Sequence, residues 1–497
     1  MTHAVVDELK ARGVSDIVVL SRDPEQSASL YGTESAKTLE FPWPPHRRER
    51  YLSEIRQVLA GDMEVLPAHD QVHAVIDLIR SSDGVVIAGG GNMTSPYGWL
   101  LYERAAVGAI AQAFDKPLII SGQTVGPVLT GPDYDTVVDL YKAASVSTVR
   151  EMTSFQLMRD AGVKTGLSLD DASFLDVAAV DPGESKAEPR YKPGRDRPFI
   201  VGTFAPGTGA MDKDDFCQRV AEVLDHIAAK GEFDVVMVPH MSRPGQADID
   251  IEMHRAIADR MNSGNVTVCG QLTAAEAASL TTRAEMVVAS RYHPVVFALS
   301  AGVPCLGLAV DYYGEVRIGG ALSNWGLGHT MRSLRHLVTE EFDAFVDQLW
   351  DTRASVREHL LTVGPQQADF QRVWWDAVVE TLKGNEVEAP ALGPPAPVLV
   401  ELHSGEHPEA AKLTANNEAH IGHQSVELYR LTHALDDATG ALAAADAELE
   451  RLRLALEGKE KSLQILETER TQLEEAVHRL ERLLPVRAWR RVRRIRS

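Results

Sequence analysis

The sequence predicts an α/β protein in which two parallel-sheet domains are followed by a long coiled-coil helix. Short β-branched runs alternate with longer helical patterns through residues 16–310, and such alternation produces a parallel sheet with helices on both faces. A polar, proline-rich segment at residues 181–197 interrupts this alternation and is expected to link the two domains. From Leu428 onward, leucines recur with the spacing of a heptad repeat.

The composition limits the class of protein. The chain has 497 residues, of which 44% are hydrophobic, so two to four structural units with sizeable cores are expected. Its formal net charge of −21 argues against nucleic acid as a partner of the main body. The three cysteines, Cys217, Cys269 and Cys305, match neither a metal spacing nor a disulfide framework and indicate a reduced, cytoplasmic interior. There is no run of about 18 apolar residues that could span a membrane, and the N-terminus has no signal-peptide pattern.

The first domain is expected over residues 1–180. Its helix over residues 4–12 precedes any strand, so the first strand of an ordinary α/β domain is expected to be absent. The proline-rich, basic residues 41–50 are expected to form a loop. The other expected elements are strands at residues 16–21, 85–88, 117–121, 145–149 and 167–169, and helices at residues 71–81, 99–114, 132–143 and up to Gly162.

Polar residues follow several of these strands. Residues 89–92, which include Gly90, Gly91 and Asn92, are expected to form a loop whose glycines allow positive φ and close backbone approach. Backbone N–H groups in such a loop can hold an anion or a sugar oxygen, although a tight strand-to-helix turn is the simpler interpretation. Residues 122–127, with Gln123, form a similar loop, and Arg150 follows the strand over residues 145–149.

The second domain is expected over residues 198–383, and His240 follows one of its strands. The expected strands lie at residues 199–204, 234–239, 266–269, 286–289 and 303–310. The expected helices lie at residues 214–229, 248–261, 295–301 and 334–383, the last broken at Gly364–Pro365. A further helix opens with a capping box from Thr273 to Glu276. The alternative for His240 is a polar cover on its strand.

Residues 286–310 carry the clearest functional pattern in the chain. A buried strand is followed by Ser290, Arg291, Tyr292 and His293, and then by a helix. In open α/β sheets, ligands bind at this carboxyl edge, and a helix N-terminus favours an anion. Arg291 offers a planar fork for phosphate or carboxylate, and His293 can move a proton near neutral pH. The alternative is a surface loop without function.

The C-terminal part is expected to comprise a flexible linker over residues 384–420, a coiled coil over residues 421–484 and a basic amphipathic tail over residues 485–497. The coiled coil implies a homo-oligomer, with an antiparallel fold-back onto the globular part as the alternative. The tail, with its apolar residues on one side, predicts binding to an anionic membrane surface, and a solvated basic tail is the alternative. The heptad a positions are Leu428, Leu435, Leu442, Leu449, Leu456, Leu463, Arg470, Val477 and Leu484, and the d positions are Leu431, Ala438, Ala445, Leu452, Lys459, Leu466, Leu473 and Leu480.

The functional motifs, taken in order, lie at residues 89–92, 122–127, 149–151 with Ser154, 171–174, 238–240, 290–293 and 301–304. Their order and spacing closely resemble those of the polysaccharide pyruvyl transferase family over roughly residues 4–350. The resemblance implies a GT-B-like fold of two Rossmann-like domains with the site between them. It also implies transfer of the enolpyruvyl carbons of phosphoenolpyruvate to two hydroxyls of a sugar, which forms a cyclic ketal and releases phosphate. The first strand and the Gly-x-x-Asn-x-Gly-Asp-type loop with which family members usually begin are not matched.

This chemistry assigns roles to the candidate residues. Phosphoenolpyruvate carries two anionic groups, and Arg150 and Arg291 are the expected clamps. His293 is the expected acid that protonates the enol carbon, and His240 binds phosphate or deprotonates the sugar hydroxyl. The expected substrate-binding residues are Gly90, Gly91, Asn92, Gln123, Ser290 and Tyr292. No metal or cofactor is required, and the acceptor is a glycan that could be lipid-linked.

Two other functions remain open from the sequence. One is a GT-B glycosyltransferase that uses a nucleotide sugar, for which Asp311 is a weak candidate to hold the ribose. The other is a catalytically inactive, membrane-associated scaffold organised by the coiled coil and the tail. The paired arginine and histidine residues favour pyruvyl transfer over both.

Overall fold

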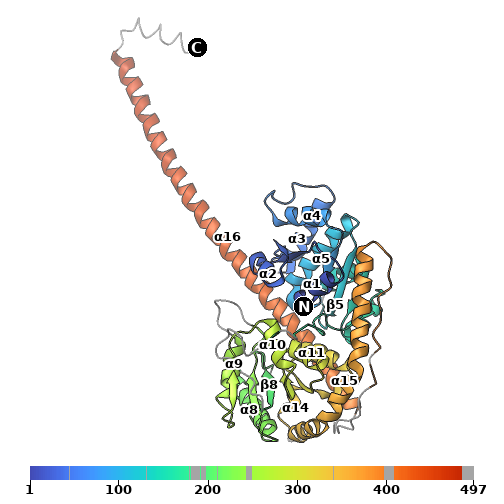
Figure 1. The fold of residues 1–497 in the computed structure, drawn as a ribbon. Coiled ribbons are helices and arrows are strands. Elements are labelled where there is room, and N and C mark those ends of the chain that lie inside the picture. The colour runs from blue at the N-terminus through green and yellow to red at the C-terminus, as the bar shows by residue number, and fades with distance from the viewer. Residues whose placement is uncertain are drawn as a thin grey trace. The chain divides into compact units, whose positions relative to one another are not determined.

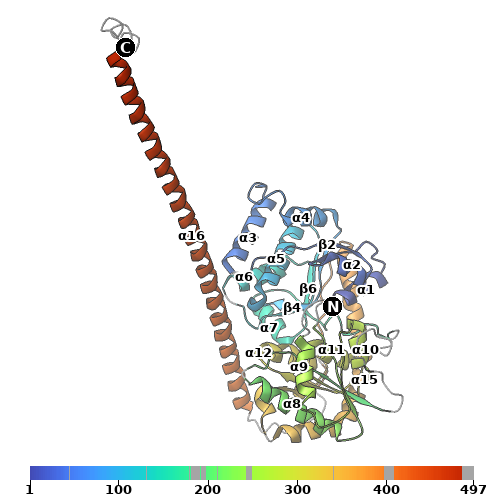
Figure 2. The ribbon, with the colours of Figure 1, turned by 90° about the vertical axis from the view of Figure 1, so that its left-hand side faces the viewer.

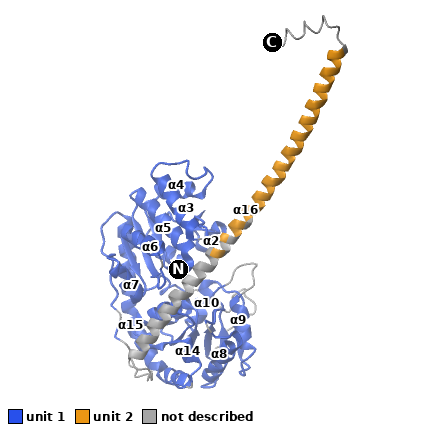
Figure 3. Ribbon diagram, turned by 180° about the vertical axis from the view of Figure 1, so that it is seen from behind, with its two compact units in different colours: residues 1–427 blue, residues 428–497 orange. Residues whose placement is uncertain are grey.

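The structure is a computed structural model that describes residues 1–43, 45–129, 131–177, 180, 191, 197–209, 211–241, 249–339, 341–393, 395–396 and 408–483. Side chains of the last range are described at residues 435, 438, 440–442 and 444–482. The chain divides into two compact units, residues 1–427 and residues 428–497 (Figure 3). The expected interdomain linker, residues 181–197, lies almost entirely outside the described residues.

The first lobe of the large unit is built on a five-stranded parallel sheet (Figure 2). Its strand order is β3 (Val85–Ile87), β5 (Leu118–Val125), β6 (Val146–Val149) and β7 (Gly166–Leu167), and β4 (Gly90–Met93) also pairs with β5. All eight residues of β5 are buried, as the central strand of a sheet covered on both faces requires. The helices of this lobe are α1 (Thr2–Ala11), α2 (Pro24–Tyr31), α3 (Pro45–Leu59), α4 (Gln71–Ser81), α5 (Gly98–Ala113), α6 (Pro132–Ala143) and α7 (Met152–Asp160), with the 3₁₀ turn η1 (Ser95–Tyr97) before α5. A separate parallel pair joins β1 (Val18–Ser21) to β2 (Glu34–Lys37).

The second lobe contains a six-stranded parallel sheet. Its order is β10 (Val266–Val268), β9 (Asp234–Met237), β8 (Phe199–Thr203), β11 (Met286–Ala289), β12 (Cys305–Ala309) and β13 (Met331–Ser333). The helices are α8 (Lys213–Ala228), α9 (Ile249–Ala258), α10 (Ala274–Thr281), α11 (Tyr292–Ser300), α12 (Tyr312–Gly314), α13 (Gly320–Ser323) and α14 (Leu334–Leu337), with the turns η3 (Glu315–Gly319) and η4 (Gly328–Thr330). The expected capping box is confirmed, because Thr273 Oγ1 accepts from Glu276 N and Glu276 caps Thr273 N in return.

A single helix, α15 (Glu341–Leu382), joins the two lobes (Figure 1). Its first half packs Phe342, Leu349 and Trp350 into the core of the second sheet. Its second half packs Trp374 and Trp375 against the first lobe. Two Rossmann-like lobes joined by a returning helix make a GT-B-like arrangement, so the predicted fold class is confirmed.

Several expectations about local structure were wrong. Residues 41–50 are not a loop throughout, because α3 begins at Pro45, a position that suits proline since its missing N–H is not needed there. Likewise, α15 continues through Pro365 instead of breaking there. Residues 90–93 and 122–125 belong to strands β4 and β5, and none of the glycines at 89–91 has positive φ.

The second unit consists, in its described part, of the long helix α16 (Pro408–Leu483). This helix begins inside the segment that was expected to be a flexible linker. The leucines at the heptad a and d positions from Leu435 to Leu480 are 55–67% exposed. Leu484 and the basic tail lie outside the described residues. Among the described helices, none has the length and apolar character needed to cross a membrane.

Candidate active site

The turn between β11 and α11 presents Arg291 and His293 at the carboxyl edge of the second sheet. All four residues of β11 are buried, and Ser290 Oγ accepts a hydrogen bond from Ala205 N at 2.9 Å, which holds the turn against β8. Arg291 is the N-cap of α11 in an extended conformation. The sequence predicted that His293 lies ahead of this helix. The helix in fact begins at Tyr292, so His293 lies within its first turn.

Arg291 is paired with a buried carboxylate that the sequence did not single out. Its Nη2 donates to Oδ1 of Asp250, in the first turn of α9. Oδ2 of Asp250 accepts from the backbone N–H groups of His240 and Met241 at 3.1 and 3.0 Å. Asp250 is fully buried, whereas the Arg291 side chain is 20% exposed. Asp250 therefore fixes the turn after β9 relative to Arg291 and offsets the charge of that arginine.

The two candidate histidines both lie near Phe297. The ring centroids of His240 and His293 are 6.3 and 6.1 Å from that of Phe297. The Nε2 atom of each imidazole is buried and has no hydrogen-bond partner among the described residues. Burial lowers the pKa of His293 to about 4, against the opposing effect of Asp170, and it lowers the pKa of His240 well below its usual value. Both imidazoles are therefore neutral at pH 7 and able to accept a proton.

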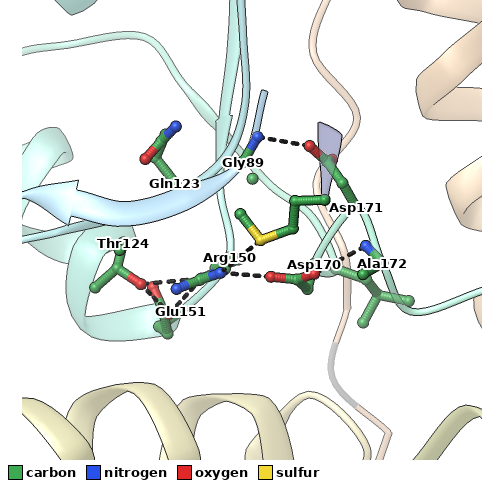
Figure 4. Close-up of polar contacts among 12 residues, drawn as sticks. Gly89, Gln123, Thr124, Arg150, Glu151, Asp170, Asp171 and Ala172 are labelled. Carbon is green, nitrogen blue, oxygen red and sulfur yellow. Dashed lines mark hydrogen bonds and ion pairs between the residues drawn. The ribbon is translucent and has the colours of Figure 1, made fainter. Parts of the chain in front are cut away.

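Arg150 occupies the matching edge of the first sheet, where it is buried in a network of polar groups (Figure 4). Its Nε donates to Thr124 Oγ1 at 2.9 Å and to Glu151 Oε1 at 3.0 Å. Its Nη1 donates to Asp170 Oδ2. Nη2 has no hydrogen-bond partner among the described residues. Two buried carboxylates thus surround one guanidinium, which leaves one nitrogen of Arg150 for a ligand.

The pKa values of the adjacent carboxyl groups of Asp170 and Asp171 are shifted in opposite directions. Burial opposes ionisation of Asp170, but the guanidinium of Arg150 outweighs it and lowers the pKa of Asp170. Burial, together with the charge of Asp170, raises the pKa of Asp171 to about 6. Asp171 accepts a hydrogen bond from Gly89 N at 2.6 Å (Figure 4). It also accepts one from Ser121 Oγ at 2.5 Å. Asp171 therefore ties β3 and β5 together at the site.

The glycines of β4 allow close packing from both sides. A Cβ on Gly91 would lie 2.4 Å from the hydroxyl oxygen of Tyr313, and the Tyr313 hydroxyl donates to the carbonyl of Gly91. A Cβ on Gly90 would lie 3.0 Å from Oε1 of Gln123. The side chain of Gln123 is fully buried, and its Nε2 donates to the carbonyl oxygen of Ala88. The side chain of Asn92 is partly exposed. These glycines thus bring β4 of the first lobe against Tyr313 of the second.

Tyr292 lies close to two arginines, one from each lobe. The Arg150 guanidinium carbon is 4.2 Å from the centroid of the Tyr292 ring, and that of Arg317 is 5.7 Å from it. Arg317 also lies 3.9 Å over the ring of Tyr313. Unlike Arg150 and Arg291, Arg317 forms no ion pair with any described carboxylate, and its Nε is buried without a hydrogen-bond partner there. Arg317 belongs to η3, one turn of π-helix, a feature frequent at functional sites.

The structure therefore brings most of the predicted site residues together. His293 interacts electrostatically with His240, Arg150, Asp170 and Arg317. The side chains of Ser290 and Gln123 form hydrogen bonds with backbone groups of nearby residues. Tyr292 and Gly91, in contrast, lie directly beside the arginines. Sequence reasoning missed Arg317 and Asp250, because neither belongs to a strand-to-helix turn. Among the described residues, no group of three or more His, Cys, Asp and Glu side chains is arranged to hold a metal ion.

The fold and the site together define a two-lobed α/β protein with arginines and histidines gathered where the lobes meet. The sequence model of the polysaccharide pyruvyl transferase family matches residues 1–312. The chain belongs to this family. No curated protein matches the sequence.

Solved structures of similar fold include sugar-nucleotide enzymes. A putative UDP-N-acetylglucosamine 2-epimerase from Listeria monocytogenes is 14% identical, with 80% of this chain and 95% of that chain covered and a TM-score of 0.48. A UDP-GlcNAc 2-epimerase from Neisseria meningitidis, bound to UDP-GlcNAc, is 12% identical, with 77% and 96% covered and a TM-score of 0.47. The S. aureus MnaA–UDP structure is 12% identical, with 79% and 96% covered and a TM-score of 0.49.

Proposed function

We propose that the large unit transfers the pyruvyl group of phosphoenolpyruvate to two hydroxyls of a sugar in a cell-surface polysaccharide or its precursor. The observation that carries the proposal is Arg317. In a chain of this family, this guanidinium has no carboxylate partner among the described residues and interacts electrostatically with His293, whose Nε2 atom is buried without a hydrogen-bond partner there. The side chain of Arg317 is partly exposed, so a ligand can reach it. Its buried Nε has no acceptor among the described residues, and an anionic ligand would supply one.

The anionic groups of phosphoenolpyruvate are proposed to bind Arg317, Arg291 and the remaining nitrogen of Arg150. A carboxylate and a phosphate require more than one cation. The charges of Arg150 and Arg291 are already offset by Asp170, Glu151 and Asp250. Arg317 is then the residue that contributes uncompensated positive charge, while Arg150 also positions Tyr292.

His293 is proposed to deliver the proton that converts the enol CH₂ of the substrate into a methyl group. In the free protein this imidazole is neutral, since burial lowers its pKa to about 4. A phosphate dianion beside it stabilises the imidazolium and raises the pKa again. One sugar hydroxyl then attacks C2 and the second displaces phosphate. The two sugar hydroxyls lose two protons in total. This number equals the one proton that the methyl group gains plus the one that leaves with phosphate. His240 is proposed to accept one of the two hydroxyl protons.

The test is phosphate release from phosphoenolpyruvate with glycan from the host's own envelope as acceptor. Wild type is expected to release phosphate only when acceptor is present, and His293→Gln is expected to abolish this release. His73→Gln, at a partly exposed histidine in the first turn of α4, is the matched control and should retain activity. Consumption of a nucleotide sugar without any release of phosphate from phosphoenolpyruvate would instead establish the glycosyltransferase alternative.

We also propose that α16 pairs with α16 of a second copy in parallel and in register. Among the described side chains, nine leucines at a and d positions are mostly exposed in the single helix, and pairing would bury them. In a parallel pair, Lys459 at d lies beside the partner's Glu460, and Arg470 at a lies beside the partner's Glu469. An antiparallel pair would place the e positions of the two helices together, and Glu460, Glu467 and Glu474 would repel.

The oligomeric state of the full chain in solution tests the pairing. Leu456→Lys, at an a position, should dissociate the dimer in sedimentation equilibrium. Leu454→Lys is the matched control, because Leu454 is 63% exposed but lies at an f position, away from the seam. If both variants behave alike, the pairing is wrong.

The basic residues 485–497 are proposed to hold the enzyme at the inner face of the cell membrane, near a lipid-linked acceptor. Six arginines alternate with apolar residues in this segment, a composition suited to anionic lipid. The full chain should sediment with vesicles containing anionic phospholipid and not with neutral vesicles. A chain in which the six arginines are replaced by serine should not sediment with either.

A further inference from the structure

Four aromatic side chains follow one another outward from the candidate active site. The ring centroids of Tyr313 and Tyr97 are 6.0 Å apart, those of Tyr97 and Trp99 are 5.8 Å apart, and those of Trp99 and Trp43 are 6.0 Å apart. Tyr97 is 37% exposed, and the other three side chains are partly exposed. We call Trp43, Trp99, Tyr97 and Tyr313 the aromatic row.

The outer end of the row is held by a buried ion pair. Arg48 Nη1 donates to the carbonyl oxygen of Trp43 at 3.1 Å, and its Nη2 donates to Asp133 Oδ2 at 3.0 Å. Arg48 reaches Trp43 by passing Gly98, where a Cβ would lie 2.2 Å from the guanidinium carbon. The lack of a side chain at Gly98 is therefore required for this arrangement, which fixes Trp43 before any ligand binds.

The inner end of the row belongs to the candidate site itself. The Tyr313 hydroxyl bonds to the carbonyl of Gly91, and the guanidinium of Arg317 lies over the Tyr313 ring. The row therefore starts at the arginine proposed to bind phosphoenolpyruvate and leads away from it over η1, the start of α5 and the segment before α3.

We propose that the aromatic row binds successive sugar units of the acceptor glycan, with Tyr313 nearest the reacting unit. The face of an aromatic ring is electron-rich, and the C–H groups on the flat face of a pyranose carry partial positive charge, so the two stack. A row of such rings suits a polymer that presents the same apolar face repeatedly. The family to which the chain belongs acts on polysaccharides, and the assignment of the acceptor rests on the proposed function.

The row could alternatively serve only to cover the core. Trp99 does pack partly against the hydrophobic core of the first lobe. Trp43 and Tyr97 do not belong to that core among the described residues, and Tyr97 is exposed. Exposed neighbouring aromatic residues beside a site are typical of ligand-binding surfaces. Trp43 and Tyr97 therefore separate the two interpretations better than Trp99.

The test is glycan binding by the full chain in the absence of phosphoenolpyruvate, measured by saturation-transfer NMR with envelope glycan fragments. Trp43→Ala and Tyr97→Ala are expected to weaken binding at least about tenfold, and Trp43→Phe is expected to restore most of it. Tyr31→Ala is the matched control, because Tyr31 is a partly exposed aromatic residue of the same lobe outside the row. Near-UV circular dichroism verifies that each variant is folded.

The outcomes distinguish this inference from the proposed function. Glycan binding that depends on Trp43 and Tyr97, without any turnover of phosphoenolpyruvate, would support the aromatic row and count against pyruvyl transfer. Turnover that persists unchanged in both alanine variants, with unchanged KM for the glycan, would overturn the aromatic row alone. Absence of glycan binding by the wild type would overturn it as well.

Discussion

The guanidinium of Arg150 lies 4.2 Å from the centroid of the Tyr292 ring, so a residue of the first lobe stacks on a residue of the second. The same junction is reinforced by Asn324, whose Nδ2 donates to the carbonyl oxygen of Arg150 at 2.8 Å. It also depends on Gly320, where a Cβ would lie 2.4 Å from Cγ of Glu151. The two halves of the candidate site are thus joined by direct contacts between buried side chains, and changes in one lobe are expected to reach the other.

Replacement of Arg150 by methionine is expected to destabilise the large unit strongly. The change leaves Glu151 and Asp170 buried without their cation, and breaking a buried ion pair in this way costs about 3–5 kcal/mol. Urea denaturation followed by tryptophan fluorescence measures the loss. Arg80→Met is the matched control, because Arg80 pairs with Asp77 on the surface and should cost less than about 1 kcal/mol. Equal losses of unfolding free energy in the two variants would show that the buried network around Arg150 stabilises the protein no more than a surface ion pair does.

Replacement of Arg317 by methionine is expected to have the opposite profile, with a small effect on stability and a large one on substrate binding. Arg317 has no carboxylate partner to strand, so only its contacts with Tyr292 and Tyr313 are lost. Loss of a charge-assisted hydrogen bond to an anion is worth about 1.5–3 kcal/mol, or roughly 10- to 100-fold in affinity. Isothermal titration with phosphoenolpyruvate measures this change.

Arg317→Lys retains the charge and should recover part of the affinity, although it cannot make a bidentate contact. Phosphoenolpyruvate binding that is the same in wild type and Arg317→Met would remove Arg317 from the site. The large unit of both variants should unfold at nearly the same urea concentration as wild type.

The sequence allowed the main residues of the candidate site to be proposed, because a strand, a polar turn and a helix are recognisable from a few consecutive residues. This is why Arg150, Arg291 and His293 were found. Asp250 and Arg317 could not be found in this way, since each acquires its role from a contact between distant elements. Residues 311–314, which include Tyr313, follow the last strand of residues 286–310 and are expected from the sequence to close the site; the contact of Tyr313 with Gly91 is seen only in the structure.

The predicted boundaries of two helices were wrong for a related reason. Proline was taken to end or exclude helices at residues 41–50 and at Pro365. At Pro45 the missing N–H falls in the first turn of α3, where it costs nothing. At Pro365, the neighbouring Leu360, Gln367 and Gln371 are buried, and this packing maintains α15 despite the lost hydrogen bond.

Binding of phosphoenolpyruvate is expected to draw a proton from solvent onto His293. Burial lowers the pKa of this imidazole to about 4, so it is neutral in the free protein at pH 7. A bound dianion raises that pKa and favours the protonated form. Titration calorimetry in buffers of different ionisation enthalpy counts the protons taken up, and His293→Gln should eliminate most of the uptake. Uptake that is unchanged in this variant would assign the proton to another group.

The same depressed pKa has a consequence for stability. Because the folded protein favours neutral His293, the contribution of this group to stability is complete above pH 6.5 and is lost as the pH falls toward 4. His254, whose pKa burial also lowers to about 4, acts in the same direction. Acid denaturation of the large unit should therefore begin below about pH 6.5, in the range where unfolded histidines bind protons.

Asp171 changes the pH dependence of stability in the opposite direction to the two histidines, and its replacement by asparagine should reveal this. Burial raises the pKa of Asp171 from 3.8 to about 6, so the folded state binds the proton more tightly than the unfolded state. The stability that Asp171 contributes is therefore present below pH 3.8 and is lost as the pH rises through 6. A shift of this size corresponds to about 3 kcal/mol.

Asp171→Asn removes this charge, and its amide can still accept from Gly89 N and donate to Ser121 Oγ. Relative to wild type, the variant is expected to gain stability between pH 4 and pH 7, measured by urea denaturation at each pH. Asp139→Asn, on the exposed face of α6, is the matched control and should show a constant difference over this range. If the curves of wild type and Asp171→Asn run parallel, Asp171 has the same pKa in the folded and unfolded states, and this prediction is wrong.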